Sequence, residues 1–175
     1  MSISIYSSAP TAQNERMREE AVQRCGATHV RDDPELQRIV ELARNTFAAR
    51  MSAVSIISED WQYLIATVGV PAGVYSRRTS FCAHTVASTR PVIYVADARS
   101  DSRFAGNPAV EDGVLRFYAG AQVRAGDHAI GAPCVFDPNP RPDGPGEKLD
   151  QLSMLATEVS GRLRELAAQP SPKRR

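Results

Sequence analysis

Cys82 and His84 are the two residues of this chain whose types and spacing best suit chemistry. A thiol near an imidazole can make a nucleophile, a metal site or a covalent linkage to a chromophore. Both stand in Ser80–Thr85, which reads S-F-C-A-H-T and can start a short helix. Two residues apart on a helix, their side chains diverge by about 200° and cannot face one ligand together. Cys82 therefore also suits a small buried apolar position, and His84 suits a helix hydrogen bond or a contact inside a pocket.

Two further segments mix aromatic with charged side chains. Asp97–Phe104 reads D-A-R-S-D-S-R-F, and Arg116–Gly120 reads R-F-Y-A-G. Apolar, strand-like sequence separates the segments, so we expect all three to contribute to one enclosed polar and aromatic site. The candidate ligand-binding residues are Phe81, Cys82, His84, Asp97, Asp101, Arg103, Phe104, Phe117 and Tyr118.

The charges of the second segment admit two interpretations. Asp and Arg alternate, so carboxylate–guanidinium pairs can hold a long loop in place while Phe104 plugs it into the core. Alternatively, Arg103 turns inward and binds a carboxylate or phosphate of a ligand. In the third segment, Phe117 and Tyr118 point to opposite faces of a strand, so only one of them can face the site.

The remaining cysteines and histidines do not complete a metal site. Among Cys25, His29, His128 and Cys134 the one close pair is Cys25 and His29, and Gly26 is expected to break the helix between them. Three widely spaced cysteines are an unsuitable number for a disulfide framework. We therefore expect free thiols, no metal, no required cofactor and no set of nucleophile, base and orienting residue.

Composition predicts one domain in the cytoplasm. The chain has 175 residues, of which 42% are hydrophobic, enough for a single core. Its formal net charge is +1, without the excess of basic residues typical of nucleic-acid-binding proteins, so we expect no nucleic-acid partner. The sequence has no signal peptide and no apolar run of about 18 residues, so we expect no membrane span. We expect one domain at residues 14–168 between a flexible start at 1–13 and a flexible basic tail at 169–175.

Hydrophobic periodicity predicts an α+β fold with antiparallel strands. Helices are predicted at residues 14–24, after the start signal Asp33-Pro34, briefly at 82–88, and at 149–166. Strands are predicted at residues 53–58, 61–68, 92–95, 117–123 and 129–136. Tight turns join the first two strands and the last two, which favours antiparallel pairing. The proline-rich residues 137–146 exclude regular structure, and Pro133 predicts that its strand lies at an edge or contains a bulge.

The long helices differ in their apolar faces. The first has only Met17, Ala21 and Val22, which suits a helix at an edge or against a second subunit. The last has the most regular apolar stripe of the chain, from Leu149 to Leu166. This stripe is longer than one face of the sheet needs to cover it. We therefore expect a homodimer through these two helices. The second helix presents five apolar residues at helical spacing: Leu36, Ile39, Val40, Ala43 and Phe47.

The order and wording of the three segments resemble the GAF domain, a small-molecule sensory module of bacterial signalling proteins. The resemblance covers roughly Asp33 to Leu166, and its core wording is S-F-C-A-H, then D-x-R-F-x-x-N-P, then R-F-Y-A-G. It implies a central antiparallel sheet of five to six strands, with the terminal helices on one face. It also implies a pocket on the other face, roofed by the short helix and long loops. Pro133 departs from the Gly-Thr-Leu-Cys-Val-type strand usual in similar GAF domains.

The resemblance implies a non-enzymatic sensory module that acts as a dimer on an unknown small molecule. A separate output protein, such as a kinase or cyclase, would then receive the signal. Two alternatives stay open. One GAF branch resembles a reductase of free methionine sulfoxide, for which Cys82 and Cys134 would have to meet. Phytochrome-like GAF domains bind a bilin through a cysteine directly before a histidine, whereas Ala83 separates Cys82 from His84 here.

Overall fold

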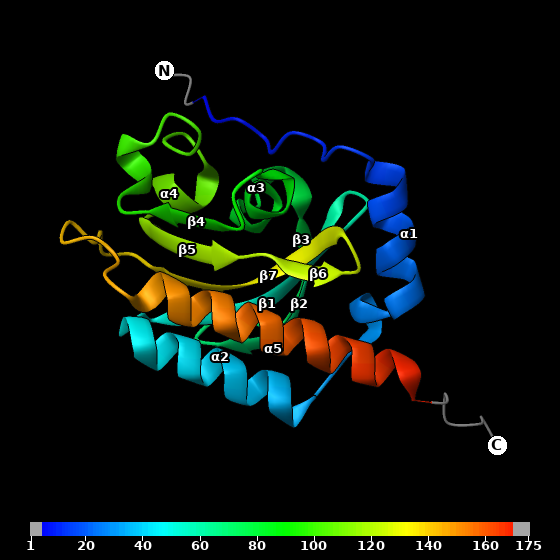
Figure 1. The fold of residues 1–175 in the computed structure, drawn as a ribbon. Coiled ribbons are helices and arrows are strands. Elements are labelled where there is room, and N and C mark those ends of the chain that lie inside the picture. The colour runs from blue at the N-terminus through cyan, green and yellow to red at the C-terminus, as the bar shows by residue number, and fades with distance from the viewer. Residues whose placement is uncertain (1–4, 170–175) are drawn as a thin grey trace.

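One antiparallel sheet separates two layers of helices in the computed structural model, which describes residues 5–169 (Figure 1). The strand order is β3-β2-β1-β7-β5-β4, and β6 pairs with β7 beyond the end of β5. The strands are β1 (Met51–Ser58), β2 (Trp61–Val68), β3 (Gly73–Ser76), β4 (Val92–Val95), β5 (Phe117–Ala121), β6 (Val123–Ala125) and β7 (His128–Asp137). The α+β class is confirmed. The sheet has seven strands instead of five to six, because residues 117–123 divide into β5 and β6 and because β3 adds an edge.

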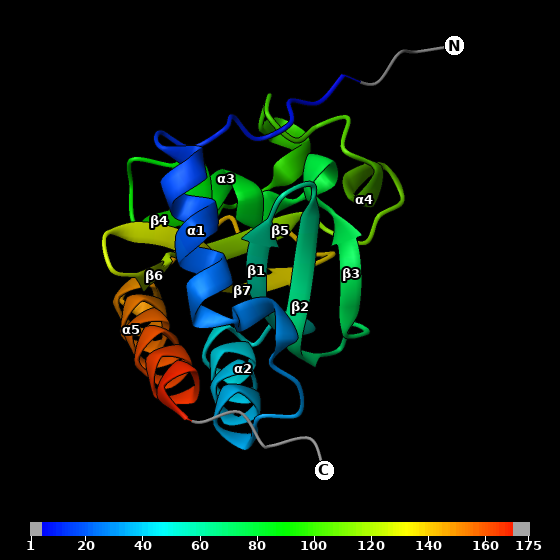
Figure 2. The same ribbon diagram turned by 90° about the vertical axis from the view of Figure 1, so that its right-hand side faces the viewer.

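Two helices, α2 (Pro34–Phe47) and α5 (Lys148–Ala168), lie side by side under one face of the sheet (Figures 1 and 2). The predicted start of α2 is confirmed, since the Asp33 carboxylate accepts a hydrogen bond from the Leu36 amide at 3.0 Å and Pro34 opens the helix. The same carboxylate pairs with Arg162 of α5 at 2.7 Å. All five predicted apolar residues of α2 are buried against the sheet and α5.

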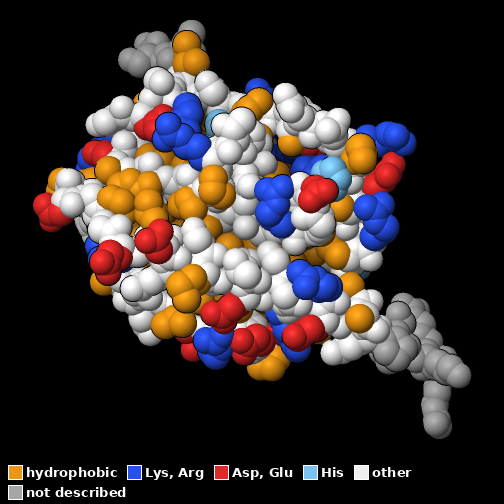
Figure 3. Space-filling view, in the orientation of Figure 1, with side chains coloured by type: hydrophobic (Ala, Val, Ile, Leu, Met, Phe, Trp, Pro, Cys, Tyr) orange, Lys and Arg blue, Asp and Glu red, His pale blue; other side chains and the backbone are white. Residues whose placement is uncertain are grey.

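The apolar stripe of α5 is buried within the chain. Leu152, Leu155, Val159 and Leu163 belong to the core between the helices and the sheet. Charged side chains of both signs are interspersed over the outer surface of α2 and α5 (Figure 3), where Arg38 bridges Glu35 and Glu158. The stripe therefore gives no support to a dimer through α5. The homodimer stays a prediction, and a monomer mass in light scattering at high micromolar concentration would rule it out.

Helix α1 (Glu15–Cys25) stands at one end of the sheet and reaches from one helical layer to the other (Figures 1 and 2). The prediction for its inner face is wrong at Met17, which is 47% exposed, whereas Arg18 is 1% exposed. The Arg18 guanidinium donates to the carbonyl oxygen of Ile57 at 2.7 Å and pairs with Glu15. An ion pair and a backbone contact therefore hold α1 to the end of β1. Gly26, at φ +63°, ends the helix as predicted.

Pro133 lies in the centre of the sheet, so the expectation of an edge strand is wrong. β7 pairs with β1 on one side, where Pro133 faces Val54. On its other side, pairing with β5 stops at Cys134, and pairing with β6 resumes at Gly131. The ladder is interrupted where proline lacks an amide donor, which is how a central strand accommodates it.

Residues 138–146 form neither helix nor strand, as predicted, although β7 includes Asp137, and Arg141 ties the segment to the fold. The Arg141 amide donates to the carbonyl oxygen of Ala96. Its guanidinium donates to the carbonyl oxygen of Ala48 at 3.0 Å and covers the ring of Phe117.

Three short 3₁₀ helices lie at Ala27–His29, Arg77–Thr79 and Ala98–Ser100. None of the helices within residues 5–169 is long and apolar enough to cross a membrane. The basic residues 170–175 lie outside the described residues.

Candidate functional site

Helix α3 (Phe81–Ala87) lies on the sheet face opposite α2 and α5, and side chains fix both of its ends (Figure 1). Ser80 caps the start, since its hydroxyl accepts from the Ala83 amide at 3.0 Å, as the sequence predicted. The Gln122 side chain donates to the carbonyl oxygens of Thr85 and Ser88, both at 2.9 Å. Cys82, which follows the cap closely, is thereby held against β7.

A cavity of about 200 Å³ lies between the sheet, α3 and α4 (Pro108–Glu111). Its walls are mainly apolar, and they include Leu64, Val70, Phe81, Leu115, Tyr118 and Phe136. Tyr75 and Val114 also line it and are exposed, so the cavity reaches the surface between β3 and the segment after α4. Cys82 and Cys134 line its inner end.

Polar side chains meet at this inner end in a short hydrogen-bonded chain. Thr85 Oγ1 lies 2.7 Å from the Tyr118 hydroxyl, and that hydroxyl donates to Cys82 Sγ at 3.4 Å. Gly120 makes room for the hydroxyl, because a Cβ there would lie well inside contact distance of it and 3.1 Å from Thr85 Oγ1. The sheet, through Tyr118 and Gly120, and α3, through Thr85, therefore both contribute to the placement of the Cys82 sulfur.

The two cysteines line the same end of the cavity, and each is 2% exposed. The hydrogen bond between their sulfurs lowers the pKa of Cys82 and raises that of Cys134 well above its usual range. Burial and the neighbouring thiols also raise the pKa of Tyr118, which stays protonated and able to donate. The pair combines a sulfur that accepts hydrogen bonds with a second thiol beside it.

Aromatic rings cover α3 on its outer side. Phe104 is 1% exposed, stacks on Phe81 with ring centroids 4.0 Å apart, and meets the edge of His84 at 4.7 Å. The prediction of a plug against the short helix is confirmed. His84 Nε2 donates to the carbonyl oxygen of Ser7 at 3.0 Å, and burial lowers the pKa of its imidazole. As the helical spacing predicted, His84 and Cys82 face different surroundings.

The charged candidates hold the loop and do not line the cavity. Arg103 pairs with Asp101 at 2.7 Å, with its guanidinium over the Phe104 ring, and Arg116 pairs with Asp97. These contacts match the interpretation in which ion pairs fix a long loop. Phe117 lies on the other face of the sheet, where it packs in the helical core. Of the nine candidates, the structure brings Phe81, Cys82 and Tyr118 to the cavity.

Sequence reasoning missed several residues of the site. Ser55 of β1 is fully buried and helps to lower the pKa of Cys82, and Thr85 holds the Tyr118 hydroxyl. Thr85 follows Cys82 by three residues, so helical spacing could have placed it on the same face. Nothing in the sequence distinguishes Ser55 from the other serines of its strand.

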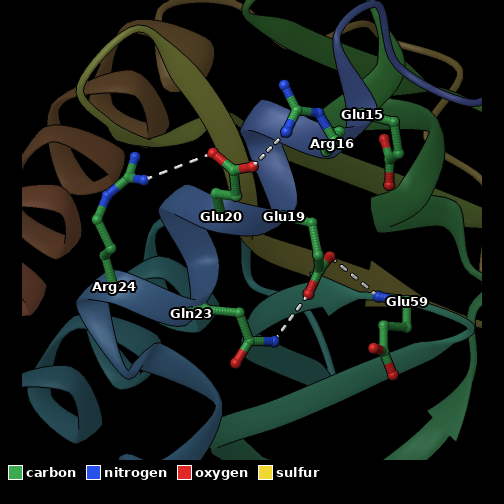
Figure 4. Close-up of a pocket in the computed structure, with 7 residues that line it drawn as sticks. All are labelled: Glu15, Arg16, Glu19, Glu20, Gln23, Arg24 and Glu59. Carbon is green, nitrogen blue, oxygen red and sulfur yellow. Dashed lines mark hydrogen bonds and ion pairs between the residues drawn. The ribbon is translucent and has the colours of Figure 1, made fainter.

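A second, more open hollow of about 620 Å³ runs along α1 (Figure 4). Most of its charged groups have partners: Arg16 pairs with Glu20 at 3.2 Å, and Glu19 accepts from Gln23 and from the Glu59 amide. Although burial raises the pKa of Glu15, hydrogen bonds from Arg18 and Arg77 lower it to about 2. The carboxylates of Glu15, Glu19 and Glu20 therefore hold the fold together.

The sequence model described as the GAF domain matches residues 33–163. The chain belongs to the GAF domain family. GAF domains are sensory and regulatory modules, and this one is 32% identical over 161 residues to a cyclic di-GMP phosphodiesterase of Pseudomonas aeruginosa. That alignment covers 90% of the chain but 27% of the phosphodiesterase, so the chain spans about a quarter of that protein.

Solved structures show the same fold at low sequence identity. The GAF domain of the Acinetobacter phosphoenolpyruvate-protein phosphotransferase superposes with a TM-score of 0.65 and 14% identity, covering 91% of this chain and 99% of that one. The free methionine-R-sulfoxide reductase of Neisseria meningitidis, solved with its substrate, superposes with a TM-score of 0.59 and 14% identity. It covers 94% of this chain and 98% of the reductase.

Proposed function

We propose that this GAF domain is a non-enzymatic regulatory module that binds a small molecule in the cavity between the sheet and α3. The observation that supports the proposal is an apolar cavity with a few converging polar groups at its inner end. A ligand there would contact α3, α4 and the central strand β7 together. Its binding would therefore act on the sheet and on the two short helices that cover this face.

The size and lining of the cavity restrict the ligand. A volume of about 200 Å³, at about 30 Å³ for each water-sized unit, holds roughly seven such units. The apolar walls favour a compact hydrophobic or aromatic body, and the hydroxyl of Tyr118 favours one polar group at its inner end. The charged loop residues Asp97, Asp101 and Arg103 would not contact the ligand, because they do not line the cavity. They form ion pairs with one another or with Arg116.

A cavity-filling variant tests this proposal. Ala109 of α4 lines the cavity, so Ala109→Leu would place three further carbon atoms in it. We expect small probes such as phenol and indole, screened beside carboxylates, nucleotides and amino acids, to raise the melting temperature of the wild type by several degrees. Ala109→Leu should abolish that rise. Ala167→Leu, on the exposed end of α5, is the matched control and should keep it.

The outcomes of that screen separate cavity binding from other binding. If Ala109→Leu responds to a probe as the wild type does, the probe binds elsewhere and the proposal loses its site. If no probe of any class shifts the wild type, the ligand-binding part of the proposal is wrong. Equal loss in both variants would point to a general effect on the fold and would contradict the assignment.

A redox enzyme is the second candidate, because Cys82 and Cys134 do meet in the cavity. Reduction of free methionine sulfoxide by the chain with a thiol reductant would establish it and end the non-enzymatic proposal. Attachment of a bilin to Cys82 is a third candidate, and visible absorbance of the purified chain after incubation with a bilin would establish it. We expect neither result, since the chain lacks the closely spaced cysteines of that reductase branch and Ala83 separates Cys82 from His84.

A further inference from the structure

We propose that Cys82 and Cys134 are a peroxide-sensitive dithiol: a small hydroperoxide oxidises Cys82, and Cys134 then closes a disulfide with it. This inference goes beyond the regulatory role, since the dithiol would react whether or not a ligand fills the cavity. It rests on the meeting of two thiols at the inner end of a cavity that opens to the surface.

The fold brings these thiols together from two layers. Cys134 lies in the central strand β7, between Ala53 of β1 and Gly120 of β5. Cys82 lies in the first turn of α3, which packs on β7. Both side chains line the same cavity beside this packed contact, and each influences the pKa of the other. Their proximity therefore depends on the tertiary structure and is lost when the chain unfolds.

The surroundings of Cys82 favour it as the sulfur that attacks. The Tyr118 hydroxyl donates to its sulfur at 3.4 Å, with Thr85 behind it. The hydroxyl of the fully buried Ser55 has no hydrogen-bond partner within the described part of the chain and helps to lower the pKa of Cys82. These donors stabilise negative charge as a thiolate or a sulfenate forms, which a purely apolar site would not do.

The proposed reaction balances without a further reactant. The Cys82 thiolate attacks the terminal oxygen of the hydroperoxide ROOH, the O–O bond breaks, and the alkoxide takes up the proton released by Cys82 to leave as ROH. Cys82 becomes a sulfenic acid. The Cys134 sulfur then attacks Cys82 Sγ, the S–O bond breaks, and hydroxide leaves with the Cys134 proton as water. The hydroperoxide gains two electrons, and the two thiols lose them.

The cavity supplies access and room for this step. A hydroperoxide would enter past Tyr75 and Val114 and meet apolar walls suited to a small organic group. A disulfide needs the sulfurs about 2.05 Å apart, so the two side chains must move from contact to bonding distance. The free volume of the cavity lies beside both side chains.

Cys25 provides a reference within the same molecule. It is half-buried near the end of α1, its thiol donates to the carbonyl oxygen of Val22 at 3.2 Å, and burial raises its pKa. If the hydroperoxide oxidised protein thiols without selectivity, Cys82 should be oxidised no faster than Cys25. Selective oxidation of Cys82 and Cys134 would therefore show that the surroundings of the cavity make them reactive.

Peptide mapping of the wild-type chain tests the proposal. The reduced protein is treated with tert-butyl hydroperoxide, or with hydrogen peroxide as the smaller probe, then alkylated in denaturant and digested with trypsin. The digest separates Cys25, Cys82 and Cys134 into residues 25–31, 79–99 and 125–148, because Arg90 and Arg141 precede proline. We expect a disulfide-linked pair of the last two peptides, reversed by dithiothreitol, while the first stays alkylated.

Substitutions then assign the roles. Cys134→Ser should stop at a sulfenic acid on Cys82, which a 1,3-diketone reagent traps, and Cys82→Ser should leave Cys134 alkylatable. Cys25→Ser, the matched control, should still form the disulfide at the wild-type rate. Tyr118→Phe keeps the ring but removes the donor, and should slow oxidation by about 2- to 10-fold. Its melting temperature is measured in parallel, so that a loosened fold is not mistaken for a lost donor.

Two results would overturn the inference. One is a cavity pair that stays fully alkylatable after exposure long enough to oxidise all three thiols of the denatured chain. The other is oxidation first at Cys25, or a disulfide between chains. Because the mapping uses the unaltered sequence, misfolding of a variant cannot hide either result.

Discussion

Replacement of Phe104 by alanine should destabilise this domain far more than replacement of its neighbour Arg103. The Phe104 ring is fully buried between Phe81 and His84, and removal of such a ring costs about 3 to 5 kcal/mol. The Arg103 side chain is 43% exposed, and its pair with Asp101 contributes about 0 to 1 kcal/mol. Its contact with the Phe104 ring adds about 0.5 to 1 kcal/mol. The difference between the variants should therefore be at least about 1 kcal/mol and up to about 5.

Urea unfolding of the two variants measures this difference. For a chain of this length, 1 kcal/mol corresponds to about 2 to 4 °C in melting temperature, so Phe104→Ala should lose about 6 to 20 °C. Phe104→Leu, which refills most of the space, should recover part of the loss. The slope of the free energy of unfolding against urea should stay that of the wild type if both variants fold fully. A Phe104→Ala protein as stable as the wild type, or an Arg103→Ala protein equally damaged, would refute the reasoning.

Two further variants probe the site and the helical layer. Gly120→Ala should lower the free energy of unfolding by about 1 to 3 kcal/mol, because the new Cβ would displace the Tyr118 hydroxyl. Adding Tyr118→Phe to that variant should recover part of the loss, which urea unfolding of the single and double variants measures. Asp33→Asn should reduce stability at neutral pH, since hydrogen bonds from Arg162 lower the pKa of Asp33 in the folded chain. A lowered folded pKa contributes stability above the unfolded value, so the difference between wild type and Asp33→Asn should shrink as the pH falls below about 4. A difference that grows in acid would contradict this pairing.

The sequence predicts most of the fold because the decisive signals are local. Asp33-Pro34 and Ser80 start their helices by caps that depend on adjacent residues. The hairpin of β1 and β2 follows from two β-branched runs around a turn. β3 escaped prediction because an exposed edge strand of four residues has no buried face and therefore no alternating pattern.

The burial of Arg18 could not be predicted for a different reason. A charged residue in a charged helix indicates a solvent-facing position unless its partners are known. Those partners are Glu15 and Glu19 nearby, but also the Ile57 carbonyl, which lies 39 residues away in the sequence. Periodicity contains no information about a contact made across that separation.

The site was predicted in its segments but not in its geometry. Alternation along β5 shows that Phe117 and Tyr118 separate, yet only the order of the strands and the position of α3 determine that Tyr118 faces the cavity. Cys82 and Cys134 are 52 residues apart, and their meeting depends on the register of β7 between β1 and β5. A one-residue change in that register would turn Cys134 to the helical core.

Helix α3 connects the cavity with the beginning of the chain, because its two sides carry different contacts. On the inner side, Cys82 lines the cavity and accepts from Tyr118. On the outer side, His84 donates to Ser7, and the segment that contains Ser7 runs over α3 and leads into α1 (Figure 1). The helix has only seven residues, and side chains hold both of its ends. The Cys82 sulfur and the contact between His84 and Ser7 therefore belong to one short helix and lie two residues apart in the sequence.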